Sequence, residues 1–284
     1  MRKTMIVAGT VLVLGLAFTG CDNNGGGDDT PPVVNPPVPA PGATQLNLTG
    51  RVYASNWDDE FFPTFTPFPT GQNRTVWSWH GGAGTIANGQ LSFTIATPTS
   101  LSPIENEIWL LGGVFDPPNA QAARLWLSTR TAGGTQNTGE LELMHFSGSV
   151  SGNSFSHERV DRLHMYVDRD VVVRMAQDWT ETETWTEDDG TIFNTTYTAR
   201  AFTITLRQGW NTVHYRLVST GTFVGTVENP TSVTMTTTET VSIADPGRQL
   251  RWSLYEWDSH HETLDLSRDA LPRGLGASPF RTRR

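Results

Sequence analysis

Apolar and polar residues alternate along much of this chain, and short runs of turn-forming residues separate the alternating segments. A period of two places every second side chain on one face of a strand, so the pattern favours β-strands over helices. Residues 45–53, 85–95 and 201–218 show it most clearly, and further strands are predicted at 124–128, 140–146, 162–167, 171–185, 231–243 and 249–257. We therefore predict an all-β fold of roughly 10–14 strands, either an antiparallel β-sandwich or a barrel-like form of it.

Two of these segments predict hairpins. Asn88 and Gly89 separate two alternating runs, and Asn-Gly is the preferred pair for a type I′ turn because both positions need positive φ. In residues 201–218 two alternating runs flank residues 207–211, which include Trp210. Trp210 is therefore expected to be exposed at the tip of a second hairpin.

The chain begins with a short cationic and apolar segment. Arg2 and Lys3 precede an apolar block over residues 5–18. The block is shorter than the roughly 20 helical residues that span a bilayer, and the arrangement is typical of a secretory signal peptide. The only cysteine of the chain, Cys21, follows this block after Thr19 and Gly20. Exported proteins normally use cysteines in pairs or not at all, so this solitary one requires another explanation.

Residues Phe18-Thr19-Gly20-Cys21 resemble the lipobox of bacterial lipoproteins. The resemblance covers residues 1–21 and implies cleavage before Cys21 and acylation of its sulfur and of its new amino terminus. Several acyl chains anchor a protein stably to a membrane. A lipid bilayer, reached through acylated Cys21, is thus the first expected partner, and the expected location is extracytoplasmic, in the cell envelope. Asp22 leaves open whether the inner or the outer membrane holds the protein.

Four segments follow from these patterns. Residues 1–20 are the predicted signal peptide, and 21–44 are the lipidated cysteine and a flexible Gly- and Pro-rich tether. Residues 45–263 are the predicted β-sandwich domain, and 264–284, with five arginines, a basic C-terminal tail. The sequence leaves open whether the body is one β domain or two. A second, weaker resemblance, to "L-x-x-GWN-x-V" hairpins of other bacterial surface lipoproteins, covers about fifteen residues around Trp210 and implies no ligand.

The composition argues against nucleic-acid binding and against sites that need cysteine. The 284-residue chain has a formal net charge of −9, and its only lysine is Lys3, so nucleic acid is not an expected partner. The body has no cysteine, which excludes disulfides and Cys-ligated metals there.

No complete metal-binding or cofactor-binding motif is present in the sequence. His157-Glu158 begins like a zinc-protease motif but lacks its second histidine, and His260-His261 has no visible third ligand. The acidic clusters at 168–170 and 187–190 lie where turns are expected. Their carboxylates also suit calcium, and the sequence leaves a calcium site open. We therefore predict no catalytic residue, no metal and no cofactor.

Aromatic side chains are the remaining candidates for a site. Trp179 and Trp185 share one face of a predicted strand, as do Trp77 and Trp79, and Trp210 is expected in a turn. Exposed tryptophans stack on sugars or anchor protein partners. Trp210, Trp179 and Trp185 are therefore the predicted ligand-binding residues.

The sequence favours a membrane-anchored envelope lipoprotein with a non-catalytic binding or structural β domain, whose further partner is a glycan or an envelope protein. The alternative is a lipoprotein glycan hydrolase that uses Glu181 and Glu183, which fall on one strand face. Whether the protein is an enzyme stays open, as do its ligand and its oligomeric state.

Overall fold

A computed structural model describes residues 40–56, 62–108, 113–187, 190–226 and 229–256. All of them lie in the second of the two units, Met1–Pro32 and Val33–Arg284, into which the chain divides. Several predicted features lie outside the described residues: the signal peptide (1–20), Cys21, most of the tether, the pair His260-His261 and the basic tail (264–284).

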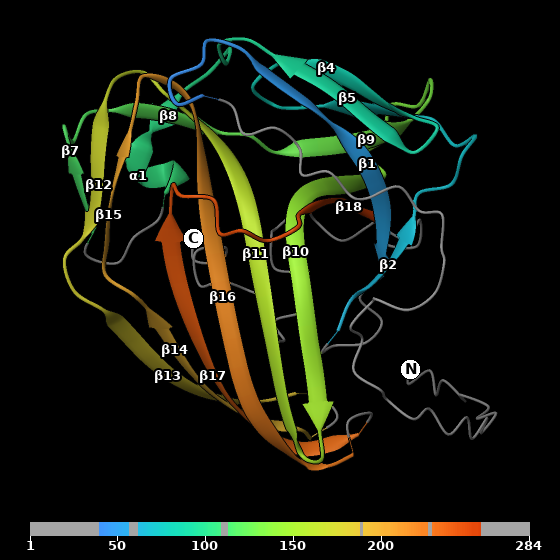
Figure 1. The fold of residues 1–284 in the computed structure, drawn as a ribbon, viewed down its shortest axis with the longest axis vertical. Coiled ribbons are helices and arrows are strands. Elements are labelled where there is room, and N and C mark those ends of the chain that lie inside the picture. Colours follow the sequence, from blue (N-terminus) through green and yellow to red (C-terminus); the bar gives the residue numbers. More distant parts are fainter. Residues whose placement is uncertain (1–39, 57–61, 109–112, 188–189, 227–228, 257–284) are drawn as a thin grey trace, which may run out of the picture. The chain divides into compact units, whose positions relative to one another are not determined.

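The described chain forms two sheets, one of 15 strands and one of three (Figure 1). The all-β prediction is confirmed, although the number of strands exceeds the expected one. Strand pairing is mostly antiparallel. The parallel pairs in the described residues join β1 (Leu46–Asn56) to β18 (Arg251–Glu256) and β14 (Ile192–Ala199) to β17 (Pro230–Ser242).

Seven strands of the large sheet close into a barrel, because each pairs with the next and the last returns to the first. In order around the ring they are β10 (Gly139–Ser151), β18, β1, β5 (Gln90–Ile95), β4 (Ala83–Ala87), β3 (Arg74–Trp77) and β9 (Leu127–Thr131). The short β2 (Thr64–Pro67) pairs with β1 beside the ring. Closure removes the free edges that an open sheet of this size would leave.

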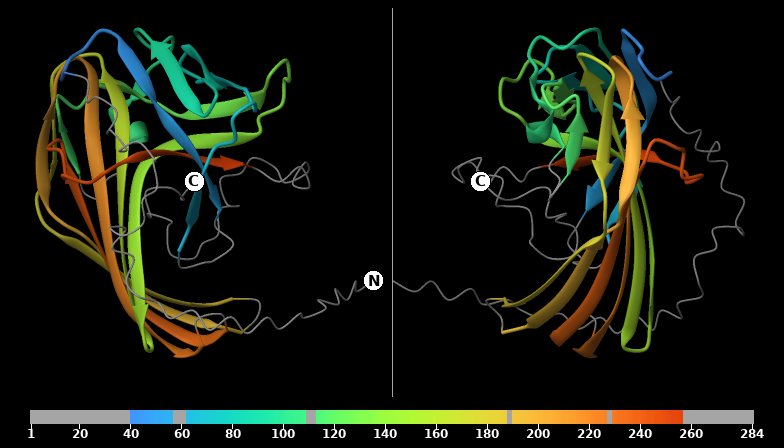
Figure 2. Two further views of the ribbon diagram at one scale, coloured as in Figure 1. Left: turned by 45° about the vertical axis from the view of Figure 1, so that its right-hand side comes forward. Right: turned by 90° about the vertical axis from the view of Figure 1, so that its left-hand side faces the viewer.

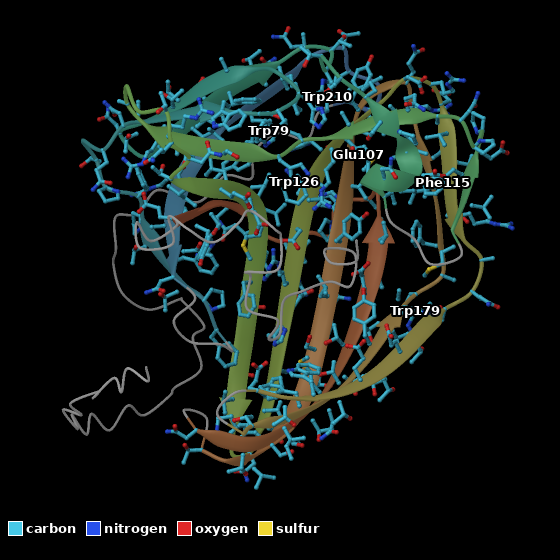
Figure 3. The ribbon with its side chains drawn as sticks, turned by 180° about the vertical axis from the view of Figure 1, so that it is seen from behind. Trp79, Glu107, Phe115, Trp126, Trp179 and Trp210 are labelled. Carbon is cyan, nitrogen blue, oxygen red and sulfur yellow. The ribbon has the colours of Figure 1, made fainter. Side chains whose placement is uncertain are left out.

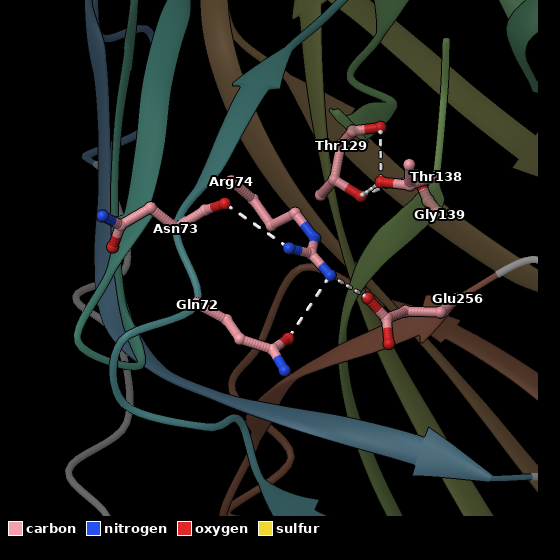
Figure 4. A network of polar contacts seen from close by, with 7 residues as sticks. All are labelled: Gln72, Asn73, Arg74, Thr129, Thr138, Gly139 and Glu256. Atoms are coloured by element: carbon pink, nitrogen blue, oxygen red, sulfur yellow. Dashed lines mark hydrogen bonds and ion pairs between the residues drawn. The ribbon is translucent and has the colours of Figure 1, made fainter. Parts of the chain in front are cut away.

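The barrel interior follows the alternation in the sequence. In β5, Leu91, Phe93 and Ile95 are buried, and the residues between them are exposed. Asn88 and Gly89 adopt φ of 51° and 73°, so the predicted Asn-Gly turn between β4 and β5 is confirmed. At one end of the barrel, Arg74 of β3 donates a hydrogen bond of 2.7 Å to Glu256 of β18 (Figure 4).

A second part of the large sheet, here called the wing, branches from the barrel at β10. From Leu143 onward β10 pairs with β11 (Ser154–Val167), while its first residues pair with β9 and β18. The wing continues through β16 (Gly209–Gly225), β17 and β14 to the edge strand β13 (Trp179–Thr186). These strands are long and bent (Figure 2).

The three-stranded sheet packs at the base of the wing. It consists of β7 (Val114–Asp116), β12 (Val171–Met175) and β15 (Phe202–Leu206). Short elements beside it are β6 (Ser102–Pro103), α1 (Ile104–Glu107) and β8 (Gln121–Arg124), which pairs with β11. Val173, Ile204 and Val213 belong to the hydrophobic core between this sheet and the wing.

The predicted hairpin over residues 201–218 is wrong. Its two strands exist as β15 and β16, but β15 pairs with β12, whereas β16 pairs with β11 and β17. Local alternation places side chains on faces and does not choose a partner strand. The stretch 171–185 likewise divides into β12 and β13, which lie in different sheets.

Candidate functional site

The strands of the wing have two chemically different faces. One face, called the apolar face, carries a cluster of buried residues that the strand register places on the same side: Phe155, Phe193, Phe223, Val233 and Met235. The opposite face carries hydroxyl and amide side chains that bond across β13 and β14, in the pairs Thr180–Thr198, Thr182–Thr196 and Thr184–Asn194. The apolar face is therefore the one on which a ligand can find aromatic contacts.

Trp185 lies on this apolar face at the edge of the sheet. Its ring is stacked on Phe193 of β14, with 5.2 Å between centroids and 5° between planes. Its indole nitrogen donates a hydrogen bond of 2.9 Å to Oε1 of Glu187. The side chain is only partly buried. One ring face is thus held against the protein while the residue remains accessible.

Trp179 lies six residues earlier on the same strand and the same face. Its ring meets Tyr197 edge to face at 6.0 Å, and it packs on a cluster that contains Met175 and Leu217. Trp179 is also partly exposed, on β13 (Figure 3). The structure thus brings two of the three predicted ligand-binding residues to one edge of one face.

Tyr197, the residue that Trp179 contacts, is bonded to a buried acid. The hydroxyl of Tyr197 donates a hydrogen bond to Oε2 of Glu239, which is 1% exposed. Tyr215 lies near the same carboxylate. Burial raises the pKa of Tyr215 to about 12, and the negative charge of Glu239 adds to the rise while Arg124 opposes it. The sequence did not indicate the Tyr197–Glu239 contact, because Glu239 lies in a threonine-rich segment whose polar composition is typical of a solvent-exposed strand.

Glu181 and Glu183 lie between the two tryptophans on the apolar face. Register places them opposite Tyr197 and Thr195, and Glu181 is half-buried while Glu183 is exposed. They are on one strand face, as the alternation predicts. Carboxylate oxygens only accept hydrogen bonds, so this edge suits a ligand rich in hydroxyl donors.

The same face has a second group of buried charges nearer the barrel. Arg159 of β11 makes ion pairs of 2.9 Å with Asp161 and with Glu142. Those carboxylates raise the pKa of Arg159 against the opposing effect of its burial. His157 lies between the rings of Phe146 and Phe155, at 5.4 and 6.3 Å. Its burial, helped by Arg159, lowers its pKa to about 4, so this histidine is neutral at pH 7.

Trp210 does not belong to this site, and the prediction that it is exposed is wrong. Its side chain is 0% exposed and packs in the hydrophobic core of the barrel. Because residues 207–211 do not form a hairpin turn, β16 already begins at Gly209, and Trp210 points into the core as a strand residue. Gly42 and Ala43, assigned by the sequence to the tether, hydrogen-bond to its backbone. Trp179 and Trp210 lie in different parts of the fold (Figure 3).

The acidic pairs and histidines do not gather into a metal centre in the described residues. Asp168 accepts hydrogen bonds from the backbone of Gln121 and from Arg169, and Asp170 accepts them from Arg207 and from the backbone of Gln208. His157 and His164 both lie on β11 but at positions of opposite parity, so they point to opposite faces of the strand. Residues 188–189 of the second acidic cluster lie outside the described residues.

The chain matches no protein-family model, no curated protein and no solved structure. Within the described residues, no helix has the length and apolar character needed to cross a bilayer.

Proposed function

We propose that this protein is a lipoprotein of the cell envelope, anchored to a membrane through acylated Cys21, and that its β domain binds a glycan without catalysis. The observation that carries the binding proposal is the pair Trp179 and Trp185 on one strand of the apolar face. Each ring is oriented by an aromatic partner and stays partly exposed. Because these side chains are ordered before the ligand arrives, binding costs less conformational entropy.

The spacing of the two tryptophans suggests the size of the ligand. Six residues along a strand correspond to about 20 Å, at about 3.3 Å per residue. This length suits an oligosaccharide chain rather than a single sugar. Glu181 and Glu183 lie between the rings and accept hydrogen bonds from sugar hydroxyls. Their negative charge disfavours acidic glycans, so the proposed ligand is a neutral or amino-substituted oligosaccharide.

The proposed membrane anchor is tested on the whole protein. We expect intact-mass measurement to show cleavage before Cys21 and added acyl chains, and membrane fractionation to recover the protein in the membrane pellet. Substitution Cys21→Ala should shift it to the soluble fraction. An unmodified amino-terminal fragment that includes residues 1–20 would exclude the anchor.

The binding site is tested with the full-length protein in detergent and a panel of neutral oligosaccharides of increasing length. We expect Trp185→Ala and Trp179→Ala each to weaken binding at least tenfold. Thr182→Ala, on the opposite face of the same strand, is the matched control and should leave the affinity unchanged. If Trp185→Ala and Trp179→Ala bound as tightly as the control Thr182→Ala, the ligand would not bind at this edge.

A hydrolytic role remains the second candidate because Glu181 and Glu183 lie two positions apart on one strand face. This places their backbones about 6.6 Å apart, a spacing from which the two carboxyl groups can reach the separations that glycosidases use. Product release from the same oligosaccharides, lost in both Glu181→Gln and Glu183→Gln, would favour the enzyme. Binding without product favours the proposed function.

A further inference from the structure

Trp79 is the most exposed large apolar side chain among the described residues, at 69%. It follows β3 on the barrel and is not part of the wing. Its ring contacts that of Trp77 at 4.8 Å between centroids, with 67° between planes. A solvent-facing tryptophan held in place by a second ring presents a flat apolar surface on which a ligand ring can stack.

Trp77 is itself fixed by its neighbours on β9 and the following loop. The guanidinium carbon of Arg130 lies 4.3 Å from the centre of the Trp77 ring, a cation–π contact. Oδ1 of Asn137 accepts two hydrogen bonds, from the indole nitrogen of Trp77 at 3.1 Å and from Nε of Arg130 at 3.2 Å. One amide oxygen thus sets the position of both the ring and the cation.

The arrangement leaves part of Arg130 available. Its side-chain hydrogen bond uses Nε, and within the part of the chain that the structure describes neither terminal nitrogen has a hydrogen-bond or ion-pair partner. Two parallel N–H groups of a guanidinium match the two oxygens of a carboxylate. Trp79 offers a flat ring face and Arg130 a carboxylate receptor, with Trp77 in contact with both.

We infer that Trp77, Trp79, Arg130 and Asn137 form a second binding site, on the barrel, that takes an acidic sugar. The sugar ring packs on the indole of Trp79, and its carboxylate accepts two hydrogen bonds from Arg130. Asn137 keeps the guanidinium in place and has no direct role in contacting the ligand. The two sites therefore select opposite ligand classes, because glutamates line the edge of the wing and an arginine lines the barrel site.

The test uses the full-length protein in detergent with Trp179→Ala and Trp185→Ala, which remove the proposed neutral-glycan site of the wing. Calorimetric titration then compares two probes, a uronic-acid oligosaccharide and its carboxyl-reduced neutral counterpart. We expect the acidic probe to bind at least tenfold more tightly than the reduced one. Trp79→Ala should lower the affinity for the acidic probe at least tenfold, and Trp79→Phe should keep most of that affinity. Arg130→Gln should abolish the preference for the acidic probe. Val224→Ala, which removes an exposed apolar side chain from the wing, is the control and should change nothing.

Three results would overturn the inference: no binding of the acidic probe by this wing-site variant, equal affinity of the variant for both probes, or unchanged affinity when Trp79→Ala is added to it. Far-ultraviolet circular dichroism of each variant shows whether the fold persists. The titration with neutral oligosaccharides described for the wing is independent of these residues, so failure of one site is distinguishable from failure of the other.

Discussion

The indole nitrogen of Trp210 donates a hydrogen bond of 2.8 Å to the carbonyl oxygen of Ala96, 114 positions away in the chain. The bond joins β16, a strand of the wing, to the segment after β5, a strand of the barrel. Trp210 also contacts Tyr166 of β11 edge to face at 5.6 Å. This one residue therefore connects the two parts of the large sheet.

Substitution of Trp210 should be among the most damaging single changes in the body. We expect Trp210→Ala to lower the free energy of unfolding by about 3–5 kcal/mol, the range for large-to-small changes at buried aromatic residues. Trp210→Phe should cost about 1–3 kcal/mol, because it keeps most of the apolar area and leaves the Ala96 carbonyl unpaired. Urea denaturation measures both. Trp79→Ala, at an exposed tryptophan, is the control and should stay within about 0.5 kcal/mol; similar losses at both sites would contradict the burial assigned to Trp210.

Stability should fall as the pH falls below about 6.5, the ordinary pKa of histidine. Burial, with Arg162 and His214 nearby, lowers the pKa of His164 to about 3. Between pH 6.5 and 3 the unfolded chain binds a proton at this residue that the folded chain does not, so acidification favours unfolding. The expected loss from pH 7 to pH 5 is about 2 kcal/mol for His164 alone.

His157 and His214 act in the same direction, since burial lowers the pKa of each to about 4. His214 accepts a hydrogen bond at Nε2 from Arg162 and must be neutral to do so. Urea titrations at pH 7, 6 and 5 measure the effect, and His164→Gln should reduce the slope. A free energy of unfolding that stays constant over this range would contradict the assignment.

The ion pair that links Arg74 to Glu256 at the end of the barrel should contribute little to stability (Figure 4). The side chain of Glu256 is 43% exposed, and solvent screens pairs of this kind. A double-mutant cycle with Arg74→Met and Glu256→Gln should give a coupling of less than about 1 kcal/mol. The coupling should shrink further in 1 M salt, where the screening length is about 3 Å. A coupling of several kcal/mol that resists salt would show that the pair is effectively buried.

Gly221 of β16 should tolerate no side chain. A Cβ at this position would lie 2.5 Å from the ring of Phe155 and 2.5 Å from the carbonyl oxygen of Thr234. Because one of these neighbours is backbone, relief requires a shift of the strand, and we expect Gly221→Ala to cost about 1–3 kcal/mol. Thermal unfolding compared with Thr222→Ala, the exposed next residue, measures the difference. An unchanged midpoint in Gly221→Ala would mean that Phe155 does not pack there.

Part of the candidate site follows from the alternation alone. Trp179 and Trp185 are an even number of positions apart, so any strand through them places both on one face, with Glu181 and Glu183 between them. The contacts that orient them do not follow, because Tyr197 and Phe193 come from another strand and Glu239 from a third. The pairing of strands depends on how whole sheet faces become buried, and the sequence of one segment does not specify this.

The sequence by itself indicated an all-β fold, many of its strands, the Asn88-Gly89 turn and which side chains share a face, because these properties depend on near neighbours. It did not indicate β2, β7 or β14. The tertiary structure decided that β15 pairs with β12, that seven strands close into a barrel and that Trp210 is buried. These properties depend on pairings between distant segments, whose free energy comes from the apolar area that the assembled faces remove from water.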